Sequence, residues 1–253
     1  MRSELLSLVV VMWLAGLVDG ARGQSDGPVA PVAAGGQSRL DADPHLVAWW
    51  KMDEASGATA ADASGRGHHG TLRDALTFDA ASVAGRVGKA LGLDGKRGFI
   101  EVPGFKGVTG TQPRTIAVWL KTKQNRGEVV GWGEDDGGKM CVVCFIRGHI
   151  GLTPRGGYYY TGERIDDDRW HHVAVVMTEG DPPNLHDNVT IYVDGSVAKV
   201  HDIGLLDLWP VETGSGIDVR IGRGFAGALD ELRIYDRALS EGEVKTLSAA
   251  GTE

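Results

Sequence analysis

The sequence predicts an all-β protein in which two antiparallel sheets pack face to face. Three observations support this prediction. From His45 to Tyr235, short runs of β-branched and aromatic residues alternate with polar residues at a period of two. The chain has 38 glycines among 253 residues, well above the usual share of about 7%, which indicates many turns. No amphipathic pattern longer than two helical turns interrupts this stretch.

Eleven segments carry the strand pattern, and this number implies two packed sheets. They are residues 46–52, 87–93, 99–102, 115–121, 128–132, 140–147, 149–153, 171–177, 189–193, 217–221 and 228–235. In the fourth segment, Ile116, Val118 and Leu120 share one face, whereas Ala117 and Trp119 share the other. Because both faces are apolar, we expect this strand near the centre of a sheet.

Two local motifs define a turn and a helix. Asp194-Gly195 directly follows a strand pattern and predicts a two-residue hairpin turn. Ser240 and Glu243 match a capping box. In this motif the serine hydroxyl accepts from the backbone N–H of the glutamate, and the glutamate carboxylate accepts from the backbone N–H of the serine. We therefore expect one short helix to follow Ser240.

The N-terminal residues 1–23 have the layout of a secretion signal, with a basic start, an apolar run over 5–18 and small residues up to Gly23. The run is shorter than the about 20 residues that span a membrane, so we favour cleavage, and a membrane is a partner only if the signal is retained as an anchor. The chain is expected to be secreted or held in the cell envelope. Residues 24–44 are rich in Gly, Ala, Pro, Ser and Asp and read as a flexible linker. The domain is then expected over 45–253.

The charge balance limits the class of partner. The formal net charge is -8, with 34 acidic and 26 basic side chains. A nucleic-acid-binding domain needs a basic stripe or patch, so nucleic acid is excluded as a partner. A neutral or cationic ligand, such as a glycan or Ca²⁺, fits this charge better.

The two cysteines, Cys141 and Cys144, stand three positions apart in a strand pattern. At about 3.3 Å per residue their Cα atoms lie about 10 Å apart, beyond the reach of a disulfide. Structural zinc sites take four Cys or His ligands, and no matching second pair is present in the sequence. We expect two buried free thiols.

Several segments together resemble the bacterial laminin G-like jellyroll domains of the concanavalin A-like superfamily. In chain order they are LVAWWKMDE (46–54), DASG (62–65), GHHGTL (67–72), GKALGLDG (88–95), TIAVWLK (115–121), RWHHVA (169–174), VTIYVDG (189–195) and GALDELRIY (227–235). Each segment alone is weak evidence, but their fixed order over about residues 45–250 is specific. The resemblance implies a jellyroll β-sandwich and a role in extracellular binding, without naming a ligand.

The resemblance also implies one structural Ca²⁺ between the N-terminal loop and the last strand. The matching positions here are Asp53, Asp62 and Asp230, and Ca²⁺ prefers such oxygen ligands. Where relatives often have Asn, this chain has Arg66 and His68. An arginine–carboxylate pair in place of the ion is therefore the alternative.

Three aromatic residues are the candidates for stacking on a sugar: Trp132, Tyr158 and Tyr160, which stand beside glycine-rich loops. Filling of the sheet surface is the alternative for the tyrosines. Trp209 is a further loop aromatic. The tryptophans inside the strand motifs, which are Trp50, Trp119 and Trp170, are expected to be core anchors.

The sequence contains none of the motifs that would indicate an enzyme. Glycosidases need paired carboxylates that face one another. The nearest match, Asp230-Glu231, should alternate between faces of a regular strand. Neither His68-His69 nor His171-His172 can chelate one ion from a strand, because neighbouring side chains point in opposite directions. The run 166–168 of three aspartates is read as a solvated turn.

The prediction is thus a secreted, non-catalytic recognition module that binds a polysaccharide or glycoprotein. The alternative is a structural or adhesion domain of the cell envelope, which would bind an extracellular protein and have no glycan site. An aromatic-poor surface would favour the alternative.

Overall fold

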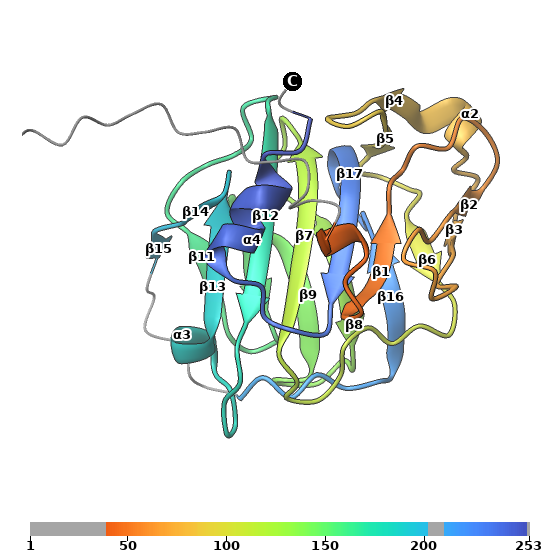
Figure 1. Cartoon of the computed structure of the whole chain (residues 1–253). Coiled ribbons are helices and arrows are strands. Elements are labelled where there is room, and N and C mark those ends of the chain that lie inside the picture. The colour runs from red at the N-terminus through yellow and green to blue at the C-terminus, as the bar shows by residue number, and fades with distance from the viewer. Residues whose placement is uncertain (1–38, 202–209, 252–253) are drawn as a thin grey trace, which may run out of the picture. The chain divides into compact units, whose positions relative to one another are not determined.

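The computed structural model describes residues 39–201 and 210–251. The expected signal and most of the expected linker, as well as Trp209, lie outside the described residues. Figure 1 shows two stacked antiparallel sheets. The predicted jellyroll β-sandwich is therefore confirmed. Of the helices in the described residues, none is both long and apolar enough to cross a membrane.

Sheet A has eight strands, and β7 and β17 lie near its centre. The order is β14 (Ser196–Val197), β13 (Val189–Val193), β12 (Trp170–Met177), β7 (Arg114–Lys121), β17 (Ala226–Tyr235), β5 (Lys89–Asp94) and β4 (Ser82–Ala84), with β1 (Leu46–Trp50) also paired to β17. The two-residue turn Asp194-Gly195 joins β13 to β14, and both residues have positive φ. This is the backbone that the predicted hairpin requires.

Sheet B has nine strands and forms the second layer. The order is β15 (Val200–His201), β11 (Tyr159–Thr161), β10 (His149–Thr153), β9 (Met140–Ile146), β8 (Glu128–Gly133), β16 (Ile217–Ile221), β6 (Ile100–Val102), β3 (Gly70–Leu72) and β2 (Thr59–Ala60). Two one-turn helices, α2 (Phe78–Ala81) and α3 (Leu185–Asn188), lie in connections.

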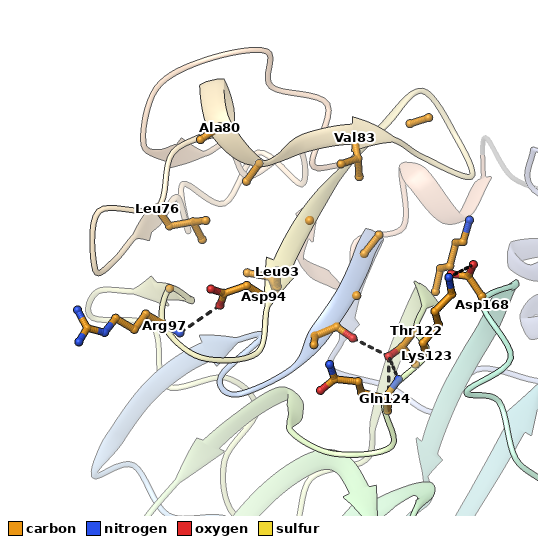
Figure 2. A pocket seen from close by; sticks show the side chains of 18 of the residues that line it. Leu76, Ala80, Val83, Leu93, Asp94, Arg97, Thr122, Lys123, Gln124 and Asp168 are labelled. Carbon is orange, nitrogen blue, oxygen red and sulfur yellow. Dashed lines mark hydrogen bonds and ion pairs between the residues drawn. The ribbon is translucent and has the colours of Figure 1, made fainter.

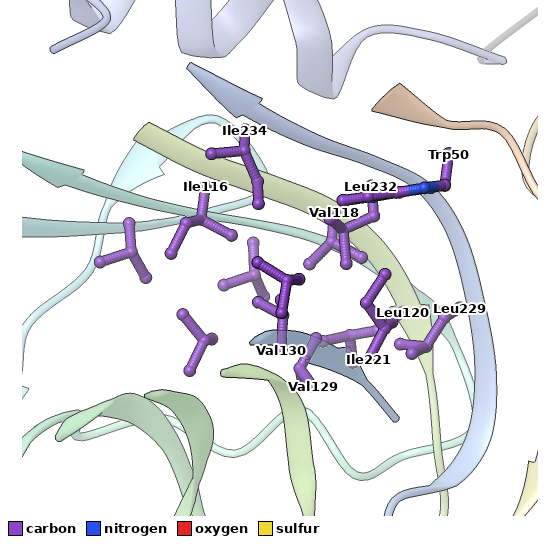
Figure 3. Packing of buried hydrophobic residues seen from close by; sticks show 14 of the residues in the cluster. Trp50, Ile116, Val118, Leu120, Val129, Val130, Ile221, Leu229, Leu232 and Ile234 are labelled. Carbon is purple, nitrogen blue, oxygen red and sulfur yellow. The ribbon is translucent and has the colours of Figure 1, made fainter. Parts of the chain in front are cut away.

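The main core lies between the sheets (Figure 3). From sheet A it takes Ile116, Val118 and Leu120, which alternate along β7 as their period of two predicts. From sheet B it takes Val129, Val130 and Ile221. These side chains are buried, so burial of apolar surface between the two sheets stabilises the sandwich.

A second apolar cluster covers the outer face of sheet A. Ala117 on β7 packs with Val244 and Leu247 of α4 (Glu241–Ser248). The helix begins with the predicted capping box between Ser240 and Glu243. The central strand β7 is thus buried on both faces, as its sequence indicates.

Residues 39–44 belong to the folded domain and not to a free linker. A helical turn at residues 39–41 lies beside α4 on sheet A (Figure 1). Leu40 is buried in the outer cluster, and Asp43 pairs with Arg237, which also binds Glu243 of α4. The boundary expected at His45 therefore falls inside the packed part of the chain.

Strand β17 contains a bulge, where its register against β7 shifts between Asp230 and Arg233. Glu231 has a φ of 54°, outside the strand region. A bulge places two residues opposite one partner residue and breaks the alternation of faces. The expectation that Asp230 and Glu231 point to opposite faces is corrected in this way. Asp230 lies opposite Trp119, on the face away from the core residues Val118 and Leu120. Glu231 binds Trp49 on the same outer face.

Candidate functional site

Trp132 is a core residue and not a stacking platform. Its side chain is fully buried, and its Nε1 donates to the backbone oxygen of Val108 at 3.0 Å. The loop at Gly107 lies directly on the indole, since a Cβ at this glycine would meet the ring at 2.4 Å. The stacking prediction for Trp132 is therefore wrong, because the 105–110 loop closes over a ring that its glycine neighbours seemed to leave open.

The two candidate tyrosines have different surroundings. Tyr160 is only 3% exposed and lies between the rings of His149 and His201, whereas Tyr158 is 41% exposed. Burial prevents Tyr160 from presenting a full ring face, so the pair does not form one platform. Tyr158 lines neither of the two cavities described here.

The three aspartates expected to bind calcium do not converge. Asp62 accepts hydrogen bonds from Trp49 N, Ser64 N, Ser64 Oγ and His68 N at 2.9–3.0 Å. These bonds hold the pKa of Asp62 low against the effect of burial, which raises it. With its oxygens engaged in this way, Asp62 does not fit the role of a calcium ligand.

Asp53 and Asp230 instead fix the turn between β4 and β5. Asp53 Oδ1 accepts from Lys89 N at 2.8 Å, and Asp230 Oδ2 accepts from the Arg86 and Val87 N–H groups at 2.7 and 2.9 Å. Asp230 Oδ1 is buried without a partner. In the described part of the chain, no group of three or more His, Cys, Asp or Glu side chains could hold a metal. The expected three-carboxylate set is thus not formed.

The alternative arginine–carboxylate pair is not formed either. Arg66 donates to the backbone oxygen of Pro44. His68 stacks on Phe105, with ring centroids 3.9 Å apart. Both side chains hold the N-terminal loop against the sandwich.

Asp230 is a buried carboxyl group with an unusual proton affinity. Burial is the largest cause that raises its pKa to about 7, and the charges of Glu231 and Asp53 add to this. Asp230 and Glu231 are fully or almost fully buried. They have no surface open to a substrate, so this carboxylate pair does not resemble a glycosidase dyad.

The free thiols and the aspartate run have structural surroundings. Cys141 is buried as expected, whereas Cys144 is partly exposed. Desolvation raises their pKa values to about 11 and about 12. The carboxylates of 166–168 pair separately with Arg164, Arg169 and Lys123. Since each has its own basic partner, the run does not act as a chelator.

An open groove of about 940 Å³ lies at the end of sheet A (Figure 2). Its floor consists of small residues on β17 and β5, namely Ala226, Gly227, Ala228 and Gly92. A side chain at Gly227 would meet Lys121 O at 2.3 Å, so close strand packing requires glycine there. Because the floor has only small side chains, a groove remains open above it. One wall of the groove is formed by α2 and β4, and the other by the loops after β7 and β11.

The second wall of the groove is polar and carries one indole. Lys121, Lys123, Gln124, Asp168 and Trp170 line it. Lys123 Nζ lies 3.1 Å from Asp168 Oδ2, and a dashed line marks this ion pair in Figure 2. Trp170 is half-buried, unlike Trp50 and Trp119. It was expected in the core, and its position at the first residue of β12, next to a polar loop, is the signal that indicates a rim residue.

The two loops of this wall are pinned by Thr122. Its Oγ1 donates to the backbone oxygen of Ala226 at 2.6 Å and accepts from Gln124 N at 2.9 Å. Its backbone oxygen accepts from Asp168 N at 2.9 Å. The wall is therefore preorganised by hydrogen bonds to the start of β17.

The two-sheet architecture defines a jellyroll β-sandwich domain. The chain belongs to the concanavalin A-like lectin/glucanases superfamily, whose family model matches residues 94–245. Human pentraxin-4 is 26% identical over 161 residues, which are 58% of this chain and 33% of pentraxin-4. The chain therefore spans about a third of the length of that relative.

Solved structures share the fold. Domain 4 of AbnA, an extracellular arabinanase from Geobacillus stearothermophilus, was solved with arabinotriose. It aligns with a TM-score of 0.58 and 22% identity over 80% of this chain and 98% of that domain. The botulinum neurotoxin D ligand-binding domain, solved with N-acetylneuraminic acid, aligns with a TM-score of 0.50 and 13% identity over 84% of this chain and 52% of that one.

Proposed function

We propose that the chain is a non-catalytic carbohydrate-binding module and that a neutral oligosaccharide binds in the groove at the end of sheet A. The observation that carries this proposal is the composition of the groove. It combines one half-buried indole, Trp170, with polar side chains of both charges above a floor without bulky side chains. Sugar sites need this combination, because aromatic faces contact sugar C–H groups while polar groups bind hydroxyls.

Charge and geometry favour a neutral sugar in this groove. The side chains of Lys123 and Asp168 neutralise each other, while Gln124 supplies an uncharged donor and acceptor. A sugar hydroxyl both donates and accepts, so it can bind either side chain of the Lys123–Asp168 pair. The arabinotriose complex of the AbnA domain supports arabinose-based oligosaccharides as the first ligands to test.

The proposal includes export and excludes catalysis. The apolar run after Arg2 supports export through a secretion signal. The burial of Asp230 and Glu231 supports a role without hydrolysis, since the nearest acidic pair is closed to substrate. The module would bind the glycan of a polysaccharide or glycoprotein without cleaving it.

The test is binding of arabinotriose and a neutral glycan array to the full chain, with Trp170→Ala and Tyr158→Ala compared. We expect Trp170→Ala to abolish retention, because it removes the only indole of the groove wall, while Tyr158→Ala binds as the unchanged chain does. Asp168→Asn is the second variant: asparagine tolerates the positive φ of this position, so the fold is kept while the charge is lost.

The controls separate a binding defect from unfolding. Each variant must keep the melting temperature of the unchanged chain within a few degrees. If neither arabinotriose nor any glycan on the array binds to folded protein, the carbohydrate proposal fails, and an adhesion domain that binds protein takes its place.

A further inference from the structure

We propose that the edge of sheet B carries a second ligand site, which binds the carboxylate or sulfate group of an acidic sugar. The site is a pocket of about 370 Å³ lined by Arg147, His149, Tyr160, Thr161, Gly162 and His201. Arg147 lies in the turn after β9 and Gly162 directly follows β11, while the other residues lie on β10, β11 and β15. No residue is shared with the groove on sheet A.

The floor of the pocket is a row of three rings on neighbouring strands. The ring centroid of Tyr160 lies 5.4 Å from that of His201 and 5.8 Å from that of His149. Tyr160 lies opposite Gly151 on β10 and opposite His201 on β15. A Cβ at Gly151 would come within 2.6 Å of Tyr160 Cβ, so the absence of a side chain there lets the tyrosine lie on the sheet.

The charges of the lining select an anion. The pocket contains one arginine, two histidines that carry charge only when protonated, and no carboxylate, in a chain whose net charge is -8. Neighbouring Arg164 is engaged by Asp166. By contrast, among the residues that the structure describes, none forms a hydrogen bond or ion pair with the exposed side chain of Arg147.

His149 leaves one ring nitrogen for a ligand. Its Nδ1 lies 3.2 Å from the backbone oxygen of Glu163. A carbonyl only accepts, so Nδ1 carries a proton. The other nitrogen, Nε2, has no partner of its own in the hydrogen bond to Glu163 and donates to an anion when the ring is protonated as an imidazolium. Arg147 adds the planar fork of donors that matches the two oxygens of a carboxylate or sulfate.

The pocket lies close to the groove proposed for neutral sugars. Gln124 lines the groove, and the next residue, Asn125, donates to Asp166 Oδ2 at 3.4 Å. A Cβ at Gly148, the neighbour of Arg147, would lie 3.4 Å from Asn125 Nδ2. Asn125 and Gly148 thus bring a wall residue of the groove close to Arg147 of the pocket, so one polysaccharide that carries acidic residues can contact both cavities. This last step alone rests on the proposed function.

The test is calorimetric titration of the full chain with three short probes: trigalacturonate for the carboxylate, a sulfated dextran oligosaccharide for the sulfate, and arabinotriose as the neutral reference. We expect one or both acidic probes to bind. Arg147→Gln should weaken that binding at least about tenfold, as expected for the loss of a hydrogen bond between charged groups. His201→Ala should weaken it as well, because it removes one ring of the floor.

Lys89→Gln is the matched control, since it removes one positive charge from an exposed position on β5. It should leave the affinity within about twofold, because Lys89 lies on a strand of sheet A and lines neither cavity. Folded Arg147→Gln protein that binds both acidic probes unchanged overturns the proposal, and so does an equal loss in Lys89→Gln. Absence of any binding by the acidic probes overturns it too.

Trp170→Ala separates this site from the groove. It should abolish the binding of arabinotriose and leave the binding of the acidic probes unchanged. If Trp170→Ala removes the binding of the acidic probes while Arg147→Gln does not, the anion lies in the groove, and the second site does not exist.

Discussion

The imidazole of His171 lies between two carboxylates, with Nδ1 2.8 Å from Asp194 Oδ2 and Nε2 3.0 Å from Asp167 Oδ1. Asp194 Oδ1 also accepts from the backbone N–H of His172. These contacts join the start of β12 to the turn after β13 and to the loop that borders the groove. Because the strength of both contacts depends on whether the His171 ring is protonated, the pH affects how firmly that loop is held.

The first prediction follows from this pair. The hydrogen bond to Asp194 is the main cause that raises the pKa of His171, and Asp167 adds to it. The contribution to the free energy of unfolding is then fully present below about pH 6.5, the ordinary value, and is lost as the pH rises through the raised pKa. Urea denaturation at several pH values gives the free energy of unfolding of the unchanged chain and of His171→Gln. We expect this free energy to depend less on pH in the variant. Equal pH dependence in the two proteins would contradict the role assigned to His171.

The second prediction concerns the protonated carboxyl of Asp230. Its pKa of about 7 lies above its ordinary value, so the folded state holds a proton that the unfolded state has released between about pH 4 and about pH 7. Stability should fall across that window as the pH rises. Asp230→Asn keeps an oxygen for the N–H groups of Arg86 and Val87, and should abolish this fall and raise stability at pH 8.

Removal of calcium distinguishes a protonated Asp230 from an Asp230 that binds calcium. If the carboxyl group is protonated and binds no metal, EDTA leaves the melting temperature unchanged and Asp230→Asn is not destabilising. A lower melting temperature in EDTA, together with a destabilised Asp230→Asn, would instead establish a calcium ion at Asp230 and Asp53, and elemental analysis would identify it.

The third prediction treats Trp132 as a core residue. Trp132→Ala should lower the free energy of unfolding by about 3–5 kcal/mol, the usual cost of removing a buried aromatic ring. Gly107→Ala should also destabilise, because its Cβ would lie 2.4 Å from the indole and because its φ is 63°. Equilibrium denaturation measures both. Trp132→Ala with unchanged stability and lost glycan binding would restore the stacking role.

The longer strands were predictable because each carries its own signal. All eleven segments predicted from the period of two correspond to strands, and β7 has both faces buried as expected. Several strands of two or three residues, such as β2, β4 and β15, escaped prediction, although the three-residue strand β6 did not. They are held by pairing with a longer neighbour, and so short a segment shows no periodicity of its own.

The candidate site was less predictable because side-chain exposure depends on contacts between distant segments. Trp132 is closed off by Val108, 24 positions away. Trp170 resembles its neighbours in a strand motif, yet it lies at the strand end and faces the groove. The bulge at Asp230 and Glu231 reverses the alternation that a regular strand would give. The alternation of side chains along a strand predicts the face of the sheet on which a residue lies, but not which distant segment packs on that face.

The position of Arg233 sets a practical limit for anyone who moves this domain into another protein. Its guanidinium is buried and pairs with Glu231 and with Asp41, which precedes the first strand. A fusion that starts at His45 would delete Asp41 and Leu40, leaving a buried cation with one partner fewer and an uncovered apolar patch on sheet A. Loss of one partner from a buried pair is strongly destabilising, so a portable version of the module has to begin at residue 39 or earlier.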